Sequence, residues 1–225
     1  MLRALVVAIV LTLLVVQPAS ARDADWKLTA TVDYTSTASV TDYQCYPDPE
    51  QVAATPVSAT VTRTVSLRTV KATVVQMYEA PNGVPATIRI GPAYKANISE
   101  TRSAGLDSSG RPVGCNGPAP AKSCPTKTLR SGAYINPLGG VHAWKGFVFE
   151  AEQEPFVPGC GLSPAEDKLP NPLELELKTS PAALTGNRPK LVFHKSRTFK
   201  ASKSEESLRS TATAKWTYTV TLTHR

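Results

Sequence analysis

Hydrophobic and polar residues alternate along much of this chain with a period of two, the pattern of a β-strand that is buried on one face. From Trp26 to Tyr34 the even positions are apolar and the odd positions are polar. The same alternation runs from Ala212 to Leu222, where threonine fills most of the intervening positions. Because threonine is β-branched and polar, it suits the solvent-facing side of a sheet. Both segments are therefore predicted to be core strands.

Strand signals also fill the middle of the chain. A long β-rich segment runs from Val57 to Tyr78, and its apolar positions change from odd to even near Arg68. A shift of one residue exchanges the two faces of a strand, so this change predicts a bulge or a change of sheet. Shorter strands are expected at residues 86–90, 126–135, 146–151, 173–178 and 190–194. A short turn is expected at residues 204–210, and no long segment has helical periodicity.

Residues that favour turns separate these strands. The chain has 19 prolines and 13 glycines, and their clusters between strand candidates are typical of many short antiparallel strands. Residues 97–125 are polar and rich in Gly, Pro and Ser, so they are predicted to form a long loop. The fold class that follows is all-β: a single-domain antiparallel β-sandwich, disulfide-stabilised, with its N- and C-terminal strands in the core.

The first 21 residues have the organisation of a secretory signal peptide. Arg3 supplies a basic start, residues 4–16 form an apolar run too short to span a bilayer, and small residues precede a cleavage point near Ala21. We therefore expect residues 22–225 to form one secreted or extracytoplasmic domain without a membrane span. Asn97 begins a formal N-glycosylation acceptor, although a three-residue match of this kind is common by chance.

Four cysteines remain after this cleavage, and an oxidising compartment favours their pairing. Cys115 and Cys124 bracket a turn-rich stretch, so these two are expected to form the disulfide that ties the loop at residues 97–125. Cys45 is then left to pair with Cys160, and closing so long a loop contributes about 4 kcal/mol in the chain-entropy model. A zinc site is the alternative, but the spacings of the cysteines do not match one.

Basic residues concentrate in one late segment of the chain. The formal net charge is +7, and it falls to +6 once Arg3 is removed with the signal peptide. No Asp or Glu occurs between Glu176 and Glu205, whereas the candidate binding residues there are Arg188, Lys190, Lys195, Arg197, Lys200 and Lys203.

A β-hairpin carrying these residues would offer a basic face to a polyanion, such as an acidic polysaccharide or a cell-wall polymer. Nucleic acid is not expected as the physiological partner. The alternative is that the lysines only protect an edge strand from pairing with other chains.

Catalytic residues are present only as dispersed candidates. His142 is the candidate base of a hydrolase, with Asp107 or Asp167 as its orienting acid and one of many serines as the nucleophile. The competing interpretation of His142 is an ordinary loop residue. The sequence has no H-E-x-x-H, G-x-S-x-G, phosphate-binding loop or EF-hand loop.

Three glutamates form the other candidate site. Glu150, Glu152 and Glu154 lie two residues apart, so on a strand they would share one face. There they would help to bind Ca²⁺ or act as an acid and base pair. The alternative is an acidic stripe on a solvated sheet face.

These observations favour a secreted, non-enzymatic binding or surface protein of the extracellular or cell-envelope space, which contacts an acidic polymer through the basic hairpin. No cofactor and no metal is expected. A secreted hydrolase with a dispersed site near His142 is the first alternative, and a purely structural surface protein is the second, because a β-sandwich as such hosts all of these functions.

Overall fold

Strands make up nearly all of the regular structure in the computed structural model of the protein. The structure describes residues 24–44, 56–70, 73–79, 85–87, 90–106, 110–112, 124–138, 145–151, 162–180, 183 and 188–224. In chain order its elements are β1 (Ala24–Asp42), β2 (Val57–Thr69), β3 (Thr73–Glu79), β4 (Pro85–Thr87), β5 (Ile90–Arg102), β6 (Cys124–Leu138), β7 (Gly146–Ala151), the 3₁₀ helix η1 (Glu166–Lys168), β8 (Glu174–Lys178), β9 (Lys190–Glu205) and β10 (Leu208–His224). The predicted all-β, antiparallel class is confirmed.

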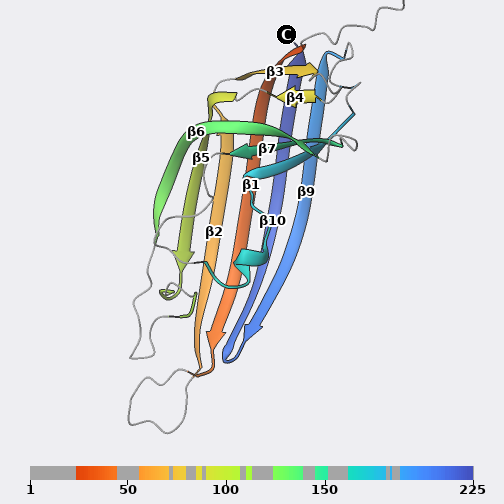
Figure 1. The fold of residues 1–225 in the computed structure, drawn as a ribbon. Coiled ribbons are helices and arrows are strands. Elements are labelled where there is room, and N and C mark those ends of the chain that lie inside the picture. Colours follow the sequence, from red (N-terminus) through yellow and green to blue (C-terminus); the bar gives the residue numbers. More distant parts are fainter. Residues whose placement is uncertain are drawn as a thin grey trace, which may run out of the picture.

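All these strands belong to one hydrogen-bonded antiparallel sheet. β1 lies in its middle and pairs with β10 on one side and with β2 and β3 on the other. From β2 the sheet continues through β5, β6 and β7 to β8, whereas β9 follows β10 at the opposite end. The pairing of β1 with β10 extends from Trp26 opposite His224 to Asp42 opposite Leu208. Figure 1 shows β2, β1, β10 and β9 side by side as the four long strands.

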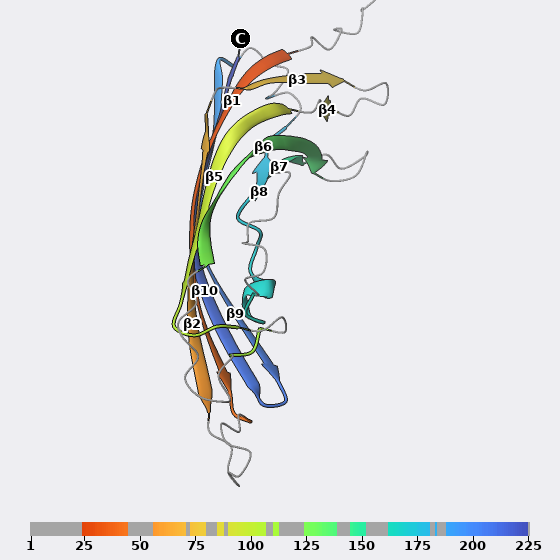
Figure 2. The ribbon, with the colours of Figure 1, turned by 90° about the vertical axis from the view of Figure 1, so that its left-hand side faces the viewer.

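The sheet is strongly bent, so that it has a convex and a concave face. In Figure 2 the long strands form a curved wall, and the segment from β6 to β8 folds over the concave side. The 3₁₀ helix η1 lies on that side too. The sheet thus covers much of its concave face itself and leaves the convex face to solvent. Within the described residues, no helix is long and apolar enough to cross a lipid bilayer.

The main hydrophobic core lies between the long strands and the folded-over segment. The even positions of β1 and β10 fill one side of it, from Trp26 on β1 to Leu222 on β10, as the alternation predicts. Phe147 of β7 and Leu175 and Leu177 of β8 fill the other side. Burial of each such side chain contributes about 1.5–3 kcal/mol. These apolar contacts hold the segment from β6 to β8 against the long strands.

β2 ends at Thr69, next to Arg68, and β3 then pairs with the first part of β1. Leu28 lies opposite Thr73 and Thr31 lies opposite Arg68, so the strand pair has two more residues on the β2–β3 side than on β1. Thr69 compensates locally, because its hydroxyl accepts a hydrogen bond from the backbone N–H of Ala30 at 2.7 Å. Because the insertion has an even number of residues, odd positions of both β2 and β3 lie opposite the inward even positions of β1. The exchange of faces expected near Arg68 is therefore wrong, and both strands belong to the same sheet.

Two sequence-based boundaries need correction. β5 runs to Arg102 and β6 begins at Cys124, so residues 97–102 and 124–125 of the expected loop at 97–125 are strand. Ile98 is buried between exposed Asn97 and half-buried Ser99, and the polar neighbours conceal the alternation in the sequence. β9 extends through Glu205, well beyond the predicted strand at residues 190–194. The two-residue turn after it, at Glu206 and Ser207, lies in the segment predicted to turn.

Candidate binding surfaces

The basic residues of the predicted hairpin lie on two different faces. β9 is an edge strand that pairs with β10 alone among the described strands. Successive side chains of a strand point to opposite faces, and Arg197 lies opposite Trp216, whose side chain is in the concave core. The structure places Lys195, Arg197 and Lys203 on the concave side, Lys190 and Lys200 on the convex side, and Arg188 exposed just before the strand. The structure therefore contains the predicted hairpin, but its basic side chains are divided between the concave and the convex face.

The convex face is polar and basic. Threonines form rows across it: Thr213, Thr37, Thr62 and Thr101 are successive partners on β10, β1, β2 and β5. Eight lysine and arginine side chains lie among the hydroxyls, namely Lys27, Arg68, Lys95, Arg130, Lys190, Lys200, Arg209 and Lys215. Asp33, which forms an ion pair with Arg68, is the only carboxylate among the side chains described on this face of β1, β2, β5, β9, β10 and the first part of β6, up to Arg130.

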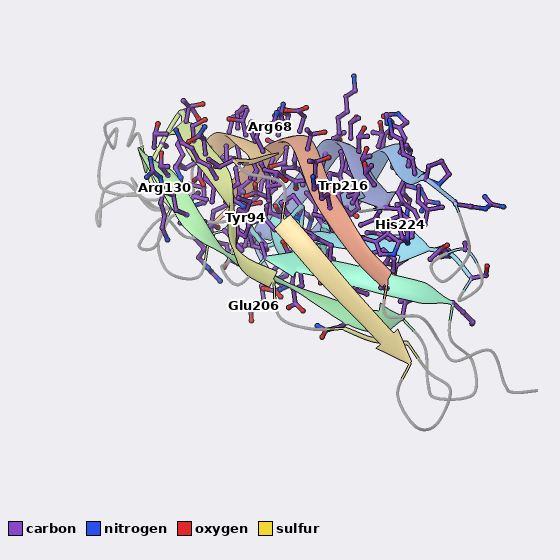
Figure 3. All side chains as sticks on the ribbon, turned by 90° about the horizontal axis from the view of Figure 1, so that it is seen from above. Arg68, Tyr94, Arg130, Glu206, Trp216 and His224 are labelled. Carbon is purple, nitrogen blue, oxygen red and sulfur yellow. The ribbon has the colours of Figure 1, made fainter. Side chains whose placement is uncertain are left out.

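Three of these cations are neighbours across the strands. Arg68 of β2 lies opposite Lys95 of β5, and Lys95 lies opposite Arg130 of β6. Like charges directly opposite each other destabilise a strand pair. The row of Arg68, Lys95 and Arg130 therefore raises the positive potential of the face, and the repulsion among the three cations destabilises the pairing of their strands. Figure 3 shows Arg68 on the outer side of the bent sheet and Trp216 on its inner side.

A groove of about 340 Å³ opens on the concave side, where β8 approaches β9 and β10. Its lining consists of Pro170, Asn171, Glu174, Glu176, Lys195, Arg197, Phe199 and Trp216. The carboxylates come from β8 and the cations from β9, so the two sides of the groove carry opposite charges. The hydroxyl of Tyr218 donates a 2.8 Å hydrogen bond to the backbone carbonyl of Glu176, which ties β8 to β10 beside the groove.

Several charged and polar groups of this groove have no ion-pair or hydrogen-bond partner among the described residues. No ion pair joins the glutamates of β8 to Lys195 or Arg197 among the described residues. The pKa of Lys195 is lowered, first by burial and then by the nearby charge of Arg197. The indole Nε1–H of Trp216 is buried and has no hydrogen-bond acceptor in the part of the chain that the structure describes. Burial raises the pKa of Tyr218, and the charge of Glu176 adds to that rise.

An ionic cluster is buried on the concave face, away from both surfaces. Arg63 of β2 donates through Nε and Nη2 to Oε2 of Glu100, at 3.0 and 2.9 Å, and Arg102 binds the other oxygen of that carboxylate. Glu166 of η1 accepts hydrogen bonds from Ser36 at 3.2 Å and from the backbone of Ser163 at 3.1 Å. The cluster joins η1 to the sheet. In the sequence, this cluster is indicated only by Arg63, which is a charged residue at a position of the strand where the alternation predicts a buried side chain.

Several predicted site residues lie outside the described residues. They are Asp107, His142, Glu152, Glu154, Cys45, Cys115 and Cys160, together with the side chain of Cys124, whose backbone begins β6. Asp167 is exposed on η1. Glu150 is exposed on β7, opposite Glu174 of β8, and accepts a hydrogen bond from Asn136 at 3.3 Å. No group of His, Cys, Asp and Glu suited to a metal ion occurs among the residues that the structure describes.

Comparison of the chain with protein-family models, with curated proteins and with solved structures finds no match.

Proposed function

We propose that the protein is a non-enzymatic binding protein of the extracytoplasmic space that holds an acidic polymer against the convex face of its sheet. The observation that carries this proposal is the composition of that face on β1, β2, β5, β9, β10 and the first part of β6, with eight cations and one carboxylate among the side chains described there. The cations would attract a polyanion, and the surrounding hydroxyls would form hydrogen bonds with its oxygens.

The spread of the charges favours a polymer over a small anion. The cations occupy β9, β10, β1, β2, β5 and β6, from Lys190 on β9 to Arg130 on β6. Neighbouring strands lie about 4.8 Å apart, so a sheet of this width presents its charges over some 25 Å. An extended acidic polysaccharide or cell-wall polymer can contact several of them at once.

The proposal includes the sequence features that favour a location outside the cytoplasm. They are a signal peptide at residues 1–21 and, in an oxidising compartment, disulfides between Cys115 and Cys124 and between Cys45 and Cys160. We also regard the long strands and the folded-over segment from β6 to β8 as the two layers of a sandwich. A hydrolase site near His142 and a purely structural role remain the alternative hypotheses.

The test uses charge reversal on opposite sides of the molecule. Substitution of Lys95, Lys200 and Lys215 by Glu changes the convex face. The control variant has Glu in place of Lys145, which precedes β7, Lys168 of η1 and Lys178, which ends β8. All three lysines are exposed, and the control changes the net charge by the same amount. Affinity for heparin and for polygalacturonate is measured for both variants and the parent at about 50 and 200 mM salt.

The convex variant is expected to bind at least about tenfold more weakly and to show a slope of log affinity against log salt that is smaller by about 2–3. The control variant should stay within about twofold of the parent. Equal losses in the two variants would mean that only net charge matters, and absence of binding by the parent would remove the proposed function.

A further inference from the structure

The groove between β8 and β9 has features of a second binding site, which does not depend on the convex face. It lies on the opposite side of the sheet, and its volume of about 340 Å³ is at the small end of the range for small-molecule sites. Its lining combines apolar rings with charged groups of both signs, the usual composition of a site that holds a polar ligand in one orientation.

One side of the groove gathers donors. Arg197 and Trp216 are cross-strand partners, and Lys195 lies two residues along β9. The Cβ atoms of directly opposed residues lie about 5 Å apart, so these two side chains begin as neighbours on the face that lines the groove. The buried indole N–H of Trp216 has no acceptor among the described residues, which costs about 1–3 kcal/mol unless a ligand supplies one. A carboxylate would accept from this donor and would be attracted by both cations.

The other side of the groove gathers acceptors. Glu174 and Glu176 are exposed on the edge strand β8, and the intervening Leu175 points into the core. These two carboxylates form no ion pair with the cations of β9 in the described structure, although both groups line the same groove. An ammonium group would be attracted to this side. Phe199 of β9, whose ring centroid lies 5.9 Å from that of Trp216, would contact the apolar body of the ligand.

We propose that this groove binds a small zwitterion, with its carboxylate toward Lys195, Arg197 and the indole N–H of Trp216 and its ammonium group toward Glu174 and Glu176. An amino acid and a short peptide both carry these two charges. A neutral saccharide would use the rings and hydrogen-bonding groups but would gain nothing from the opposite charges.

The indole N–H signal of Trp216 in ¹H–¹⁵N NMR spectra reports on the site directly, and loss of one signal in Trp216→Phe assigns it among the three tryptophans. The probes are phenylalanine, Gly-Phe, N-acetyl-Gly-Phe, Gly-Phe amide and maltose. We expect phenylalanine or Gly-Phe to shift this signal saturably. Removal of either charge by acetylation or amidation should weaken binding by about tenfold or more.

Two substitutions on β8 and one on β9 complete the test. Glu174→Gln combined with Glu176→Gln alters exposed side chains, and it should weaken binding of Gly-Phe while leaving that of its N-acetyl derivative unchanged. Lys200→Gln, on the convex face of β9, should leave binding of all probes unchanged. The proposal is wrong if no probe shifts the signal up to about 10 mM, if the capped dipeptides bind as well as Gly-Phe, or if only maltose binds. None of these outcomes affects the heparin measurement, so the proposal for the groove and the proposal for the convex face can be refuted separately.

Discussion

At the scale of single residues, the inward positions of this sheet are not all apolar. Arg63 lies between Val61 and Val65 on β2, and its side chain is buried with that of Glu100. A buried charge loses its hydration, which costs several kcal/mol, so it depends on its partner more than a surface charge does. Glu100 binds Arg63 through one oxygen and Arg102 through the other, and thus serves two cations.

Glu100→Gln is expected to lower the free energy of unfolding by about 3–5 kcal/mol, because two buried guanidinium groups lose the charge between them. Glu150→Gln, at an exposed position of β7, should change it by less than about 0.5 kcal/mol. Urea unfolding followed by circular dichroism measures both. If Glu100→Gln is as stable as the parent, the cluster does not hold η1 and β5 to the sheet.

At the scale of elements, the sequence predicted strands best where one face is buried without interruption. β1 and β10 alternate cleanly because each has a strand on either side and a core beneath it. The second half of β9 was missed because an edge strand has Lys and Ser on both faces. Residues 97–102 of β5 were missed because the inward positions include Glu100 and Arg102, whose pairing is visible only in three dimensions.

Gly146 shows how one backbone position controls a strand pair. It begins β7 with φ of +141°, and a Cβ atom there would lie 2.1 Å from the backbone oxygen of Leu177 on β8. Gly146→Ala is expected to cost about 1–3 kcal/mol and to loosen β8 from β7. Amide hydrogen exchange of β8 and urea unfolding test this, with Lys145→Ala as the neighbouring exposed control. Unchanged exchange in Gly146→Ala would show that β7 can shift to accommodate the methyl group.

At the scale of the whole molecule, neither of the two proposed binding surfaces could be derived from the sequence. The convex face needs the register of six strands before its cations come together, and Arg68, Lys95 and Arg130 are far apart in the chain. The groove forms only because the segment from β6 to β8 folds over the concave face and brings Glu176 and Arg197 into the same lining. The sequence did indicate an excess of positive charge and an edge strand that carries part of it.

Two buried tyrosines predict how the stability of the molecule depends on pH. The pKa values of Tyr34 and Tyr218 are raised above 10.0, in both cases chiefly by burial. The unfolded chain therefore loses these protons first. The stability they contribute is complete below about pH 10 and is lost as the pH rises through their folded pKa values. Lys195, with a lowered pKa, acts in the opposite sense as the pH approaches 10.5.

Tyr218→Phe is expected to lower the free energy of unfolding at neutral pH by about 1 kcal/mol, because the hydrogen bond to Glu176 is lost. Between about pH 9 and 11 its stability should fall less steeply than that of the parent. Urea midpoints across this range measure the difference, with Tyr43→Phe as the exposed control. Parallel curves for Tyr218→Phe and the parent would mean that this tyrosine does not contribute to alkaline unfolding.

The pairing of β1 with β10 has a consequence for the order in which the chain can fold. The middle of the sheet joins Trp26 to His224, so its central ladder cannot be complete until the ribosome has synthesised His224. Contacts so distant in sequence close slowly, and folds dominated by them typically take milliseconds to seconds. The chain therefore leaves the ribosome without its central ladder. For the secreted protein proposed above, this delay would keep the strands of the ladder available for passage through a narrow export channel.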